Sequence, residues 1–310
     1  MNTLIIEFNT WHGECLPPVI HLLASHGDNL TLICPTSTFN ALTPAEQHQV
    51  HHVPSHGRGL PAALRVMRLI HSLHPDQLYL NTAQGSGALW LSLLLTFSRI
   101  PLIGTIHNLT KLQSSLGQRL ISHRISAYYV LAPYLLPHLQ QLTTLPAHIL
   151  PTLPDNGGPA LTIPPDTSLA IIPGSVDFNR RDYASLIPLA QSRPDLTFVI
   201  LGDISRHDGP RLLSLISTLP HVILNPSLPI TLPHPLPRFI LFSQFIPRHL
   251  FDAFLRSAKY LLPLIPPAHT DLYLTRKVSG TFILSARFHL PLLIPPALAP
   301  LANSYPTSPL

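Results

Sequence analysis

Charged residues are scarce in this 310-residue chain. Lys, Arg, Asp and Glu together make up 11% of it, against about 25% in an average soluble domain. Hydrophobic residues make up 45%, so the composition excludes both a disordered chain and a supercharged one. The length accommodates two domains of roughly 150 residues, each with a core of its own.

Cysteine is almost absent. Cys15 and Cys34 are the two cysteines, and two are too few for a disulfide framework. Cys34 lies in an apolar, strand-like run, so we expect reduced thiols and a cytoplasmic location. The segment Met1–Glu7 lacks the basic region and the long apolar stretch of a signal peptide, which favours the same expectation.

Runs of basic residues are missing as well. The formal net charge is +5, but no Lys/Arg cluster interleaved with aromatic residues occurs, so we expect no nucleic-acid partner. Diffuse positive charge suits phosphate-bearing small molecules or an anionic membrane surface. Either a peripheral contact of the N-terminal half with anionic lipid or a merely solvated polar face accounts for five arginines: Arg58, Arg65, Arg68, Arg119 and Arg124.

No apolar run is long enough to cross a membrane. The longest candidate extends from Ala88 to Ile106, but Arg99 and Pro101 interrupt it. Its uninterrupted part is about half of the ~20 residues that a span requires. We therefore predict a buried helix over residues 87–97 and a buried strand over residues 102–106.

The chain has 19 histidines, but they do not show the spacing of a metal site. His48, His51, His52 and His56 cluster without acidic or cysteine partners, and their spacing matches no familiar metal site. We predict a solvated polar loop over residues 48–59 and no bound metal.

Short apolar runs alternate with helix-like segments along the whole chain, which is typical of parallel sheets with helices on both faces. In the first half we predict strands over residues 4–8, 30–34, 77–80, 102–106 and 127–131. The second half repeats the alternation, with strands over residues 168–172, 196–201, 222–225, 239–242, 260–264 and 292–294. Prolines cluster over residues 145–167, which predicts a linker. The expected domains are residues 1–150 and residues 151–310, each a doubly wound, Rossmann-like α/β unit.

Ligands of such sheets bind where the strands end and lead into helices. The loop from Gly174 to Asp182 contains Arg180 and Arg181 just before a helix predicted over residues 182–191. Glycine allows a ligand to approach the backbone, and arginines supply forked donors to phosphate oxygens. Two solvated arginines at a surface helix are the competing interpretation. Likewise, Lys277-Val278-Ser279-Gly280 suits either a phosphate cradle or an ordinary serine N-cap.

Taken in order, these loops resemble the nucleotide-sugar glycosyltransferases of the GT-B fold, specifically the group 1-like enzymes. The likeness extends over nearly the whole chain, although its C-terminus is short. The matching pieces are the runs at 78–82 (LYLNT), 101–108 (PLIGTIHN), 128–133 (YYVLAP), 172–174 (IPG) and 198–202 (FVILG), the pair Arg180-Arg181, and the pattern Tyr273-x-x-x-Lys277-x-Ser279-Gly280 with Ala286 and Pro291.

The resemblance implies a fold of two Rossmann-like domains facing each other across a cleft, a metal-independent hexosyltransferase activity and no cofactor. It implies a UDP- or GDP-linked donor and a glycan or lipid-linked acceptor. His107 matches the histidine near the transferred sugar, and Glu14 is a second catalytic candidate. Donor-binding roles are implied for Gly174, Arg180, Arg181, Gly202, Lys277, Ser279 and Gly280. The loop with His12 and Gly13 matches the acceptor side.

The sequence departs from the family in one place. Many retaining members have two glutamates before the final strand, where this chain has Arg276 and Leu284. A serine-glycine variant of this helix also occurs in the broader group, so the change leaves the anomeric outcome open. Two alternatives to a transferase therefore stand: a catalytically silent binding or partner subunit, and a sugar-nucleotide epimerase on the same fold.

Overall fold

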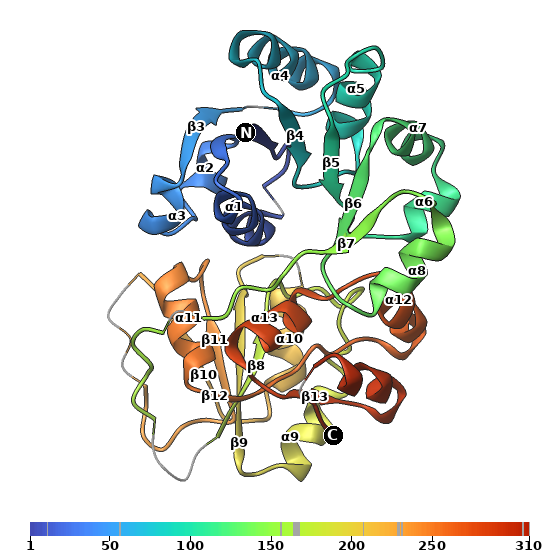
Figure 1. Cartoon of the computed structure of the whole chain (residues 1–310). Helices are drawn as coiled ribbons and strands as arrows, with labels where there is room; N and C mark the ends of the chain where they lie inside the picture. The colour runs from blue at the N-terminus through green and yellow to red at the C-terminus, as the bar shows by residue number, and fades with distance from the viewer. Residues whose placement is uncertain are drawn as a thin grey trace. The chain divides into compact units, whose positions relative to one another are not determined.

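The computed structural model describes the whole chain except Trp11, His56, Asn156, residues 164–167, His207, Leu228, Pro229, Thr231, Pro306 and Leu310, and except the side chains of Ala302 and residues 307–309. The described residues form two compact units (Figure 1). Unit 1 comprises Met1–Leu153 and the short segment Thr275–Val278, and unit 2 comprises Pro154–Leu274 and Ser279–Leu310.

Unit 1 is built on a seven-stranded parallel sheet with the order β3-β2-β1-β4-β5-β6-β7. The strands are β1 (Asn2–Ile6), β2 (Asn29–Cys34), β3 (Val50–Pro54), β4 (Gln77–Leu80), β5 (Leu102–Thr105), β6 (Ala127–Val130) and β7 (Ala147–Ile149). Ile6 pairs with Ile33 on one side and with Leu80 on the other. The chain winds outward in both directions from β1, so the switch point, where such sheets hold ligands, lies between β1 and β4.

The helices of unit 1 are α1 (Leu16–Ser25), α2 (Thr36–Phe39), α3 (Pro44–His48), α4 (Gly59–Leu73), α5 (Ser86–Leu94), α6 (Thr110–Ser114), α7 (Leu116–Arg124) and α8 (Leu135–Leu142). Helix α5 packs against α4 on one side and α7 on the other. These three helices form a row beside the sheet (Figure 1), as expected for successive right-handed crossovers that advance in one direction.

Unit 2 repeats this design with a sheet of the order β10-β11-β9-β8-β12-β13-β14. Its strands are β8 (Ser168–Pro173), β9 (Leu196–Asp203), β10 (His221–Leu224), β11 (Phe239–Phe242), β12 (Ala258–Leu261), β13 (Leu292–Ile294) and β14 (Thr307–Pro309). The helices include α9 (Leu186–Ser192), α10 (Gly209–Ile216), α11 (Arg248–Arg256), α12 (Thr270–Thr275) and α13 (Gly280–Phe288). The central strands are buried because helices cover both faces of the sheet.

Several predicted elements are wrong in detail. Residues 50–54 form the edge strand β3 and not a loop, because they pair with β2 over their whole length, from Val50 opposite Leu30 to Pro54 opposite Cys34. The stacking of His52 on Phe39 supports this pairing. Strand β7 lies within the predicted linker, which also includes residues outside the described part of the chain. Helix α9 begins at Leu186 and not at Asp182.

The predicted buried helix over residues 87–97 is wrong in two respects. Helix α5 ends at Leu94, and one side of it is exposed. Trp90 is 39% exposed, and Phe97, just beyond the helix, is 98% exposed. None of the helices in the described part of the chain has both the length and the apolar character needed to cross a bilayer.

Candidate functional site

In unit 1, polar side chains gather where the three central strands end. Glu7 follows β1, Asn81 follows β4, and His107 comes two residues after β5. Because β1, β4 and β5 are neighbours in the sheet, their carboxyl ends bring these three residues together. All three are buried.

Glu7 organises this cluster. One carboxylate oxygen accepts hydrogen bonds from the Asn81 amide (2.7 Å) and the Thr82 hydroxyl (2.6 Å). The other accepts one from the backbone N–H of Asn9 (2.7 Å). A buried carboxylate is stable only when such donors replace its water. Asn81 also donates to the His12 carbonyl oxygen (2.9 Å), so the network fixes the loop after β1.

His107 is held as a neutral ring. Its Nε2 donates to the Asn81 carbonyl oxygen at 3.0 Å; a carbonyl can only accept, so the proton lies on Nε2 and Nδ1 has a free lone pair. Burial, and then the nearby His12, lower the pKa of His107 to about 3, although the Asn81 carbonyl opposes the shift. Gln84 fixes its backbone by accepting from the N–H groups of His107 (3.1 Å) and Asn108 (3.2 Å).

His12 links this buried ring to the surface. The imidazole rings of His12 and His107 stack, with their centroids 3.9 Å apart and an interplanar angle of 22°. His12 Nδ1 lies 3.5 Å from a carboxylate oxygen of Glu14, whose side chain is half exposed. The predicted site residues His12, Glu14 and His107 are therefore adjacent. Gly13 lies between His12 and Glu14. A Cβ added to Gly13 would lie 3.2 Å from the methyl group of Thr38.

The segment Thr275–Val278 joins unit 1 at the same strand ends. Lys277 forms an isolated antiparallel bridge with Asn108, the neighbour of His107. The N–H of Leu109 donates to the Arg276 carbonyl oxygen (2.9 Å), and the Tyr134 hydroxyl donates to the Lys277 carbonyl oxygen (3.0 Å). Lys277, predicted on the donor side, thus contacts the histidine loop of unit 1.

In unit 2, Gly174 and Gly202 bring two strand ends close together. Gly174 follows β8 with a φ of +98°, and a Cβ on Gly202 would lie 2.3 Å from the Gly174 carbonyl oxygen. Glycine is therefore required at both positions, one for its backbone angle and the other for close approach.

The two arginines predicted to bind the donor diphosphate differ in their surroundings. Arg181 donates to the carbonyl oxygen of Pro173, at the end of β8, and to that of Pro263 (3.2 Å), beyond β12. Burial lowers its pKa, but an arginine remains charged. Arg180 is exposed. Arg181 thus ties two strand ends together, while Arg180 remains accessible from solvent.

Ser279 and Gly280 begin helix α13. The Ser279 hydroxyl caps the helix by accepting from the Thr281 N–H (3.3 Å), so the alternative of an ordinary N-cap correctly describes its local role. An added Cβ on Gly280 would meet nothing within 4 Å. The first turn of α13 is therefore open at Gly280.

Glu7, Asn81 and Gln84 were not among the predicted site residues, although Asn81 lies in the run 78–82 that matches the family. Glu7 and Asn81 directly follow apolar strands, the position where ligands of open α/β sheets bind. Asn81 Oδ1 is buried without a hydrogen-bond partner, at a cost of about 1–3 kcal/mol. No group of three or more His, Cys, Asp or Glu residues suited to a metal occurs among the described residues.

Comparison with known proteins gives the fold a name. No protein-family model and no curated protein matches the sequence, but many solved structures share the architecture. Anabaena HepE in complex with UDP and glucose aligns with 100% of this chain and 86% of its own, with a TM-score of 0.64 and 14% identity.

Two further structures show the same likeness. A putative UDP-N-acetylglucosamine 2-epimerase from Listeria monocytogenes aligns at a TM-score of 0.59 and 13% identity, over 94% of this chain and 78% of its own. A glycosyltransferase from Rickettsia africae aligns at a TM-score of 0.58 and 12% identity, also over 94% of this chain and 78% of its own. The fold predicted from the sequence is thus confirmed: this chain has the GT-B fold, which glycosyltransferases and UDP-N-acetylglucosamine 2-epimerases share.

Proposed function

We propose that this chain is a metal-independent glycosyltransferase that moves a sugar from a UDP- or GDP-linked donor to a glycan or lipid-linked acceptor. Such a reaction serves the synthesis of a surface polysaccharide, glycolipid or glycoconjugate. The observation that carries the proposal is the stacked pair His12–His107 on the buried Glu7–Asn81 network. It lies at the switch point of a sheet with the GT-B fold, where that architecture binds ligands.

The proposed role of His107 follows from its protonation. A base works best when its pKa is near the operating pH, and the pKa of His107 is about 3. We therefore assign its Nδ1 lone pair to accept a hydrogen bond from a sugar hydroxyl, and not to remove a proton. The pair of His12 and Glu14 is more exposed and already within 3.5 Å, so we assign it to accept the proton of the acceptor hydroxyl.

Unit 2 is proposed to hold the nucleotide diphosphate. The exposed Arg180, the glycine at 174 and the open N-terminus of α13 at Gly280 supply cationic and backbone donors without a metal. Arg181 supports this surface by fixing the ends of β8 and β12.

An epimerase on the same fold is the second candidate. Its support is that a Neisseria meningitidis epimerase bound to UDP-N-acetylglucosamine aligns over 95% of this chain at a TM-score of 0.55, and that two histidines beside a buried carboxylate also suit proton transfer. The silent partner subunit has less support, because a binding scaffold has no need of the stacked pair His12–His107 beside Glu14 or of the exposed Arg180.

Calorimetry of the purified protein against UDP, GDP and their common sugar conjugates tests the proposal. Micromolar binding of one nucleotide class is the expected result, with loss in Arg180→Ala. The products then separate the reactions: a transferase releases nucleotide only with an acceptor, whereas an epimerase yields a new sugar epimer without one. No binding of any nucleotide would contradict both enzymatic proposals and favour the partner subunit.

A further inference from the structure

The outer side of the helix row α4–α5–α7 is apolar where a soluble surface is normally polar. On α5, Trp90 and Leu93 are three residues apart, so they lie on one side of the helix; Phe97 follows three residues beyond its end. All three are exposed, and Phe97 is 98% exposed. Leu93 and Phe97 therefore extend outward and do not contribute to the core.

The neighbouring helices extend this surface. On α7, Leu116 and Leu120 are spaced by four residues and are 73% and 43% exposed. On α4, Leu64 is 42% exposed. Because α5 packs against both α4 and α7, these exposed side chains lie on neighbouring helices, and we call the outer side of this row the helix-row face. Large apolar side chains exposed on adjacent helices favour an interaction site.

The charges on the helix-row face have a single sign. Arg68 of α4, Arg99 after α5 and Arg119 of α7 are all exposed. The sequences of α4, α5 and α7 contain no Asp or Glu, and neither does the whole stretch from Gln77 to Pro154. Arginine without neighbouring carboxylates favours an anionic partner.

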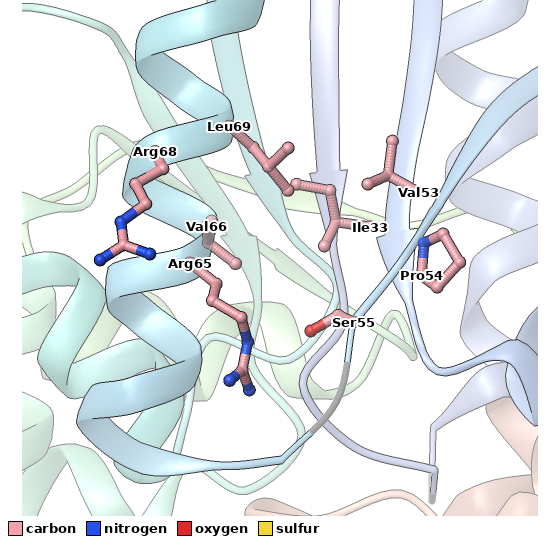
Figure 2. Close-up of a pocket in the computed structure, with 8 residues that line it drawn as sticks. All are labelled: Ile33, Val53, Pro54, Ser55, Arg65, Val66, Arg68 and Leu69. Atoms are coloured by element: carbon pink, nitrogen blue, oxygen red, sulfur yellow. The ribbon is translucent and has the colours of Figure 1, made fainter.

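A hollow beside α4 has the same mixed character (Figure 2). Its volume is about 280 Å³. Apolar side chains from two strands and the helix, including Ile33, Val53 and Leu69, line it together with Arg65 and Arg68. Figure 2 shows both arginines extending from α4 next to these apolar groups. An apolar hollow with a basic rim suits an amphiphile that has an anionic head.

We propose that the helix-row face docks on a phospholipid bilayer with anionic headgroups. The aromatic and leucine side chains enter the interfacial region, and the arginines contact lipid phosphates, as for amphipathic surfaces that lie in the plane of a membrane. A protein partner would need carboxylates and a complementary shape, whereas a bilayer satisfies a broad, purely basic and apolar surface. This inference does not depend on which reaction the chain catalyses.

Vesicle flotation tests the inference. The full chain is mixed with vesicles of phosphatidylcholine alone, or of phosphatidylcholine with phosphatidylglycerol, at low and high salt. We expect binding to the anionic vesicles that weakens with salt, because screening shortens the reach of the arginine charges. The charge-reversed variant Arg68→Glu/Arg119→Glu should lower the partition coefficient by roughly 25-fold or more, since each arginine near the membrane surface strengthens binding by about fivefold.

Two matched controls come from unit 2. The variant Arg206→Glu/Lys259→Glu changes the net charge equally at exposed positions and should bind vesicles like the parent chain. Phe97→Ser should reduce partitioning about tenfold, whereas Phe245→Ser, at a phenylalanine that is 80% exposed, should not. Circular dichroism verifies that every variant is folded.

Three outcomes would overturn the inference: no binding to anionic vesicles at low salt, equal loss in the control variants, or a parent chain that forms a dimer dissociated by Phe97→Ser. Nucleotide affinity, measured by calorimetry on the same proteins, keeps this result separate from the proposed function. The variants tested by vesicle flotation should retain the nucleotide affinity of the parent chain.

Discussion

The imidazole ring of His12 stacks on that of His107 with 3.9 Å between their centroids. One ring belongs to the loop after β1 and the other to the loop after β5, and the Asn81 carbonyl between these strands fixes the second ring. The stack leaves His107 buried and His12 partly exposed, with Glu14 at its outer side. A chain of three ionisable groups thus extends from the interior of unit 1 to its surface.

The neutral His107 should make the stability of the protein depend on pH. Its pKa is about 3 in the folded chain and about 6.5 when unfolded. Between these values the unfolded state binds the extra proton, so the free energy of unfolding falls as the pH drops below about 6.5, by up to ~1.4 kcal/mol per pH unit. Urea unfolding of the parent chain and of His107→Gln should show their difference in stability decreasing by about 1.6 kcal/mol from pH 6.5 to pH 5. A pH-independent difference would mean that the ring is not held neutral.

Glu7 should be required for stability and not only for function. Glu7→Gln replaces an acceptor by an amide N–H₂ that faces one of the present donors: Asn81, Thr82 or the Asn9 N–H. We expect a loss of about 1.5–3 kcal/mol in the free energy of unfolding, since the bonds to a buried charge are the stronger kind. Glu14→Gln is the matched control, because that side chain is half exposed and its change should stay within about 0.5 kcal/mol. Equal losses in both variants would refute the buried network.

Substitutions of Arg180 and Arg181 should have different effects, one on nucleotide binding and the other on the free energy of unfolding. Arg181→Met removes charged hydrogen bonds to the carbonyl oxygens of Pro173 and Pro263, so thermal or urea unfolding should show a loss of about 1.5–3 kcal/mol. Arg180→Ala, at an exposed position, should change stability by less than about 0.5 kcal/mol while weakening nucleotide binding in calorimetry. The reverse pattern would assign the diphosphate contact to Arg181.

Much of this architecture could be predicted from the sequence because buried parallel strands are continuous apolar runs. The runs 77–80 and 239–242 are strands in the structure where they were expected, and the strand predicted over residues 127–131 ends one residue earlier. Strand β3 was not predicted, because its histidines are polar and suggest a loop. Residues 50–54 form a strand through their pairing with β2, supported by packing against Phe39. The pairing with β2 and the contact with Phe39 depend on the tertiary fold, so the local sequence does not predict this strand.

The candidate site was predictable only in part. His107 and His12 follow apolar strands, which is a signal in the chain itself, but their stacking depends on the order of the strands in the sheet. The same holds for Arg181, since the carbonyl group of Pro263 that it contacts is 82 residues away. Lys277 is a further case: its contact with Asn108 places a residue from late in the sequence in unit 1.

Gly280 and Gly202 provide the sharpest test of the proposed donor surface. A methyl group on Gly280 would meet nothing within 4 Å, whereas one on Gly202 would lie 2.3 Å from the Gly174 carbonyl oxygen. Gly280→Ala should therefore keep or raise stability, by up to about 1 kcal/mol, because alanine restricts the unfolded chain. Gly202→Ala should cost about 1–3 kcal/mol by overpacking. If a diphosphate rests on the first turn of α13, Gly280→Ala also weakens nucleotide binding in calorimetry without any loss in melting temperature. Unchanged affinity in this stable variant would remove Gly280 from the binding surface and leave the Gly174–Arg180 loop as the remaining candidate for the phosphate contact.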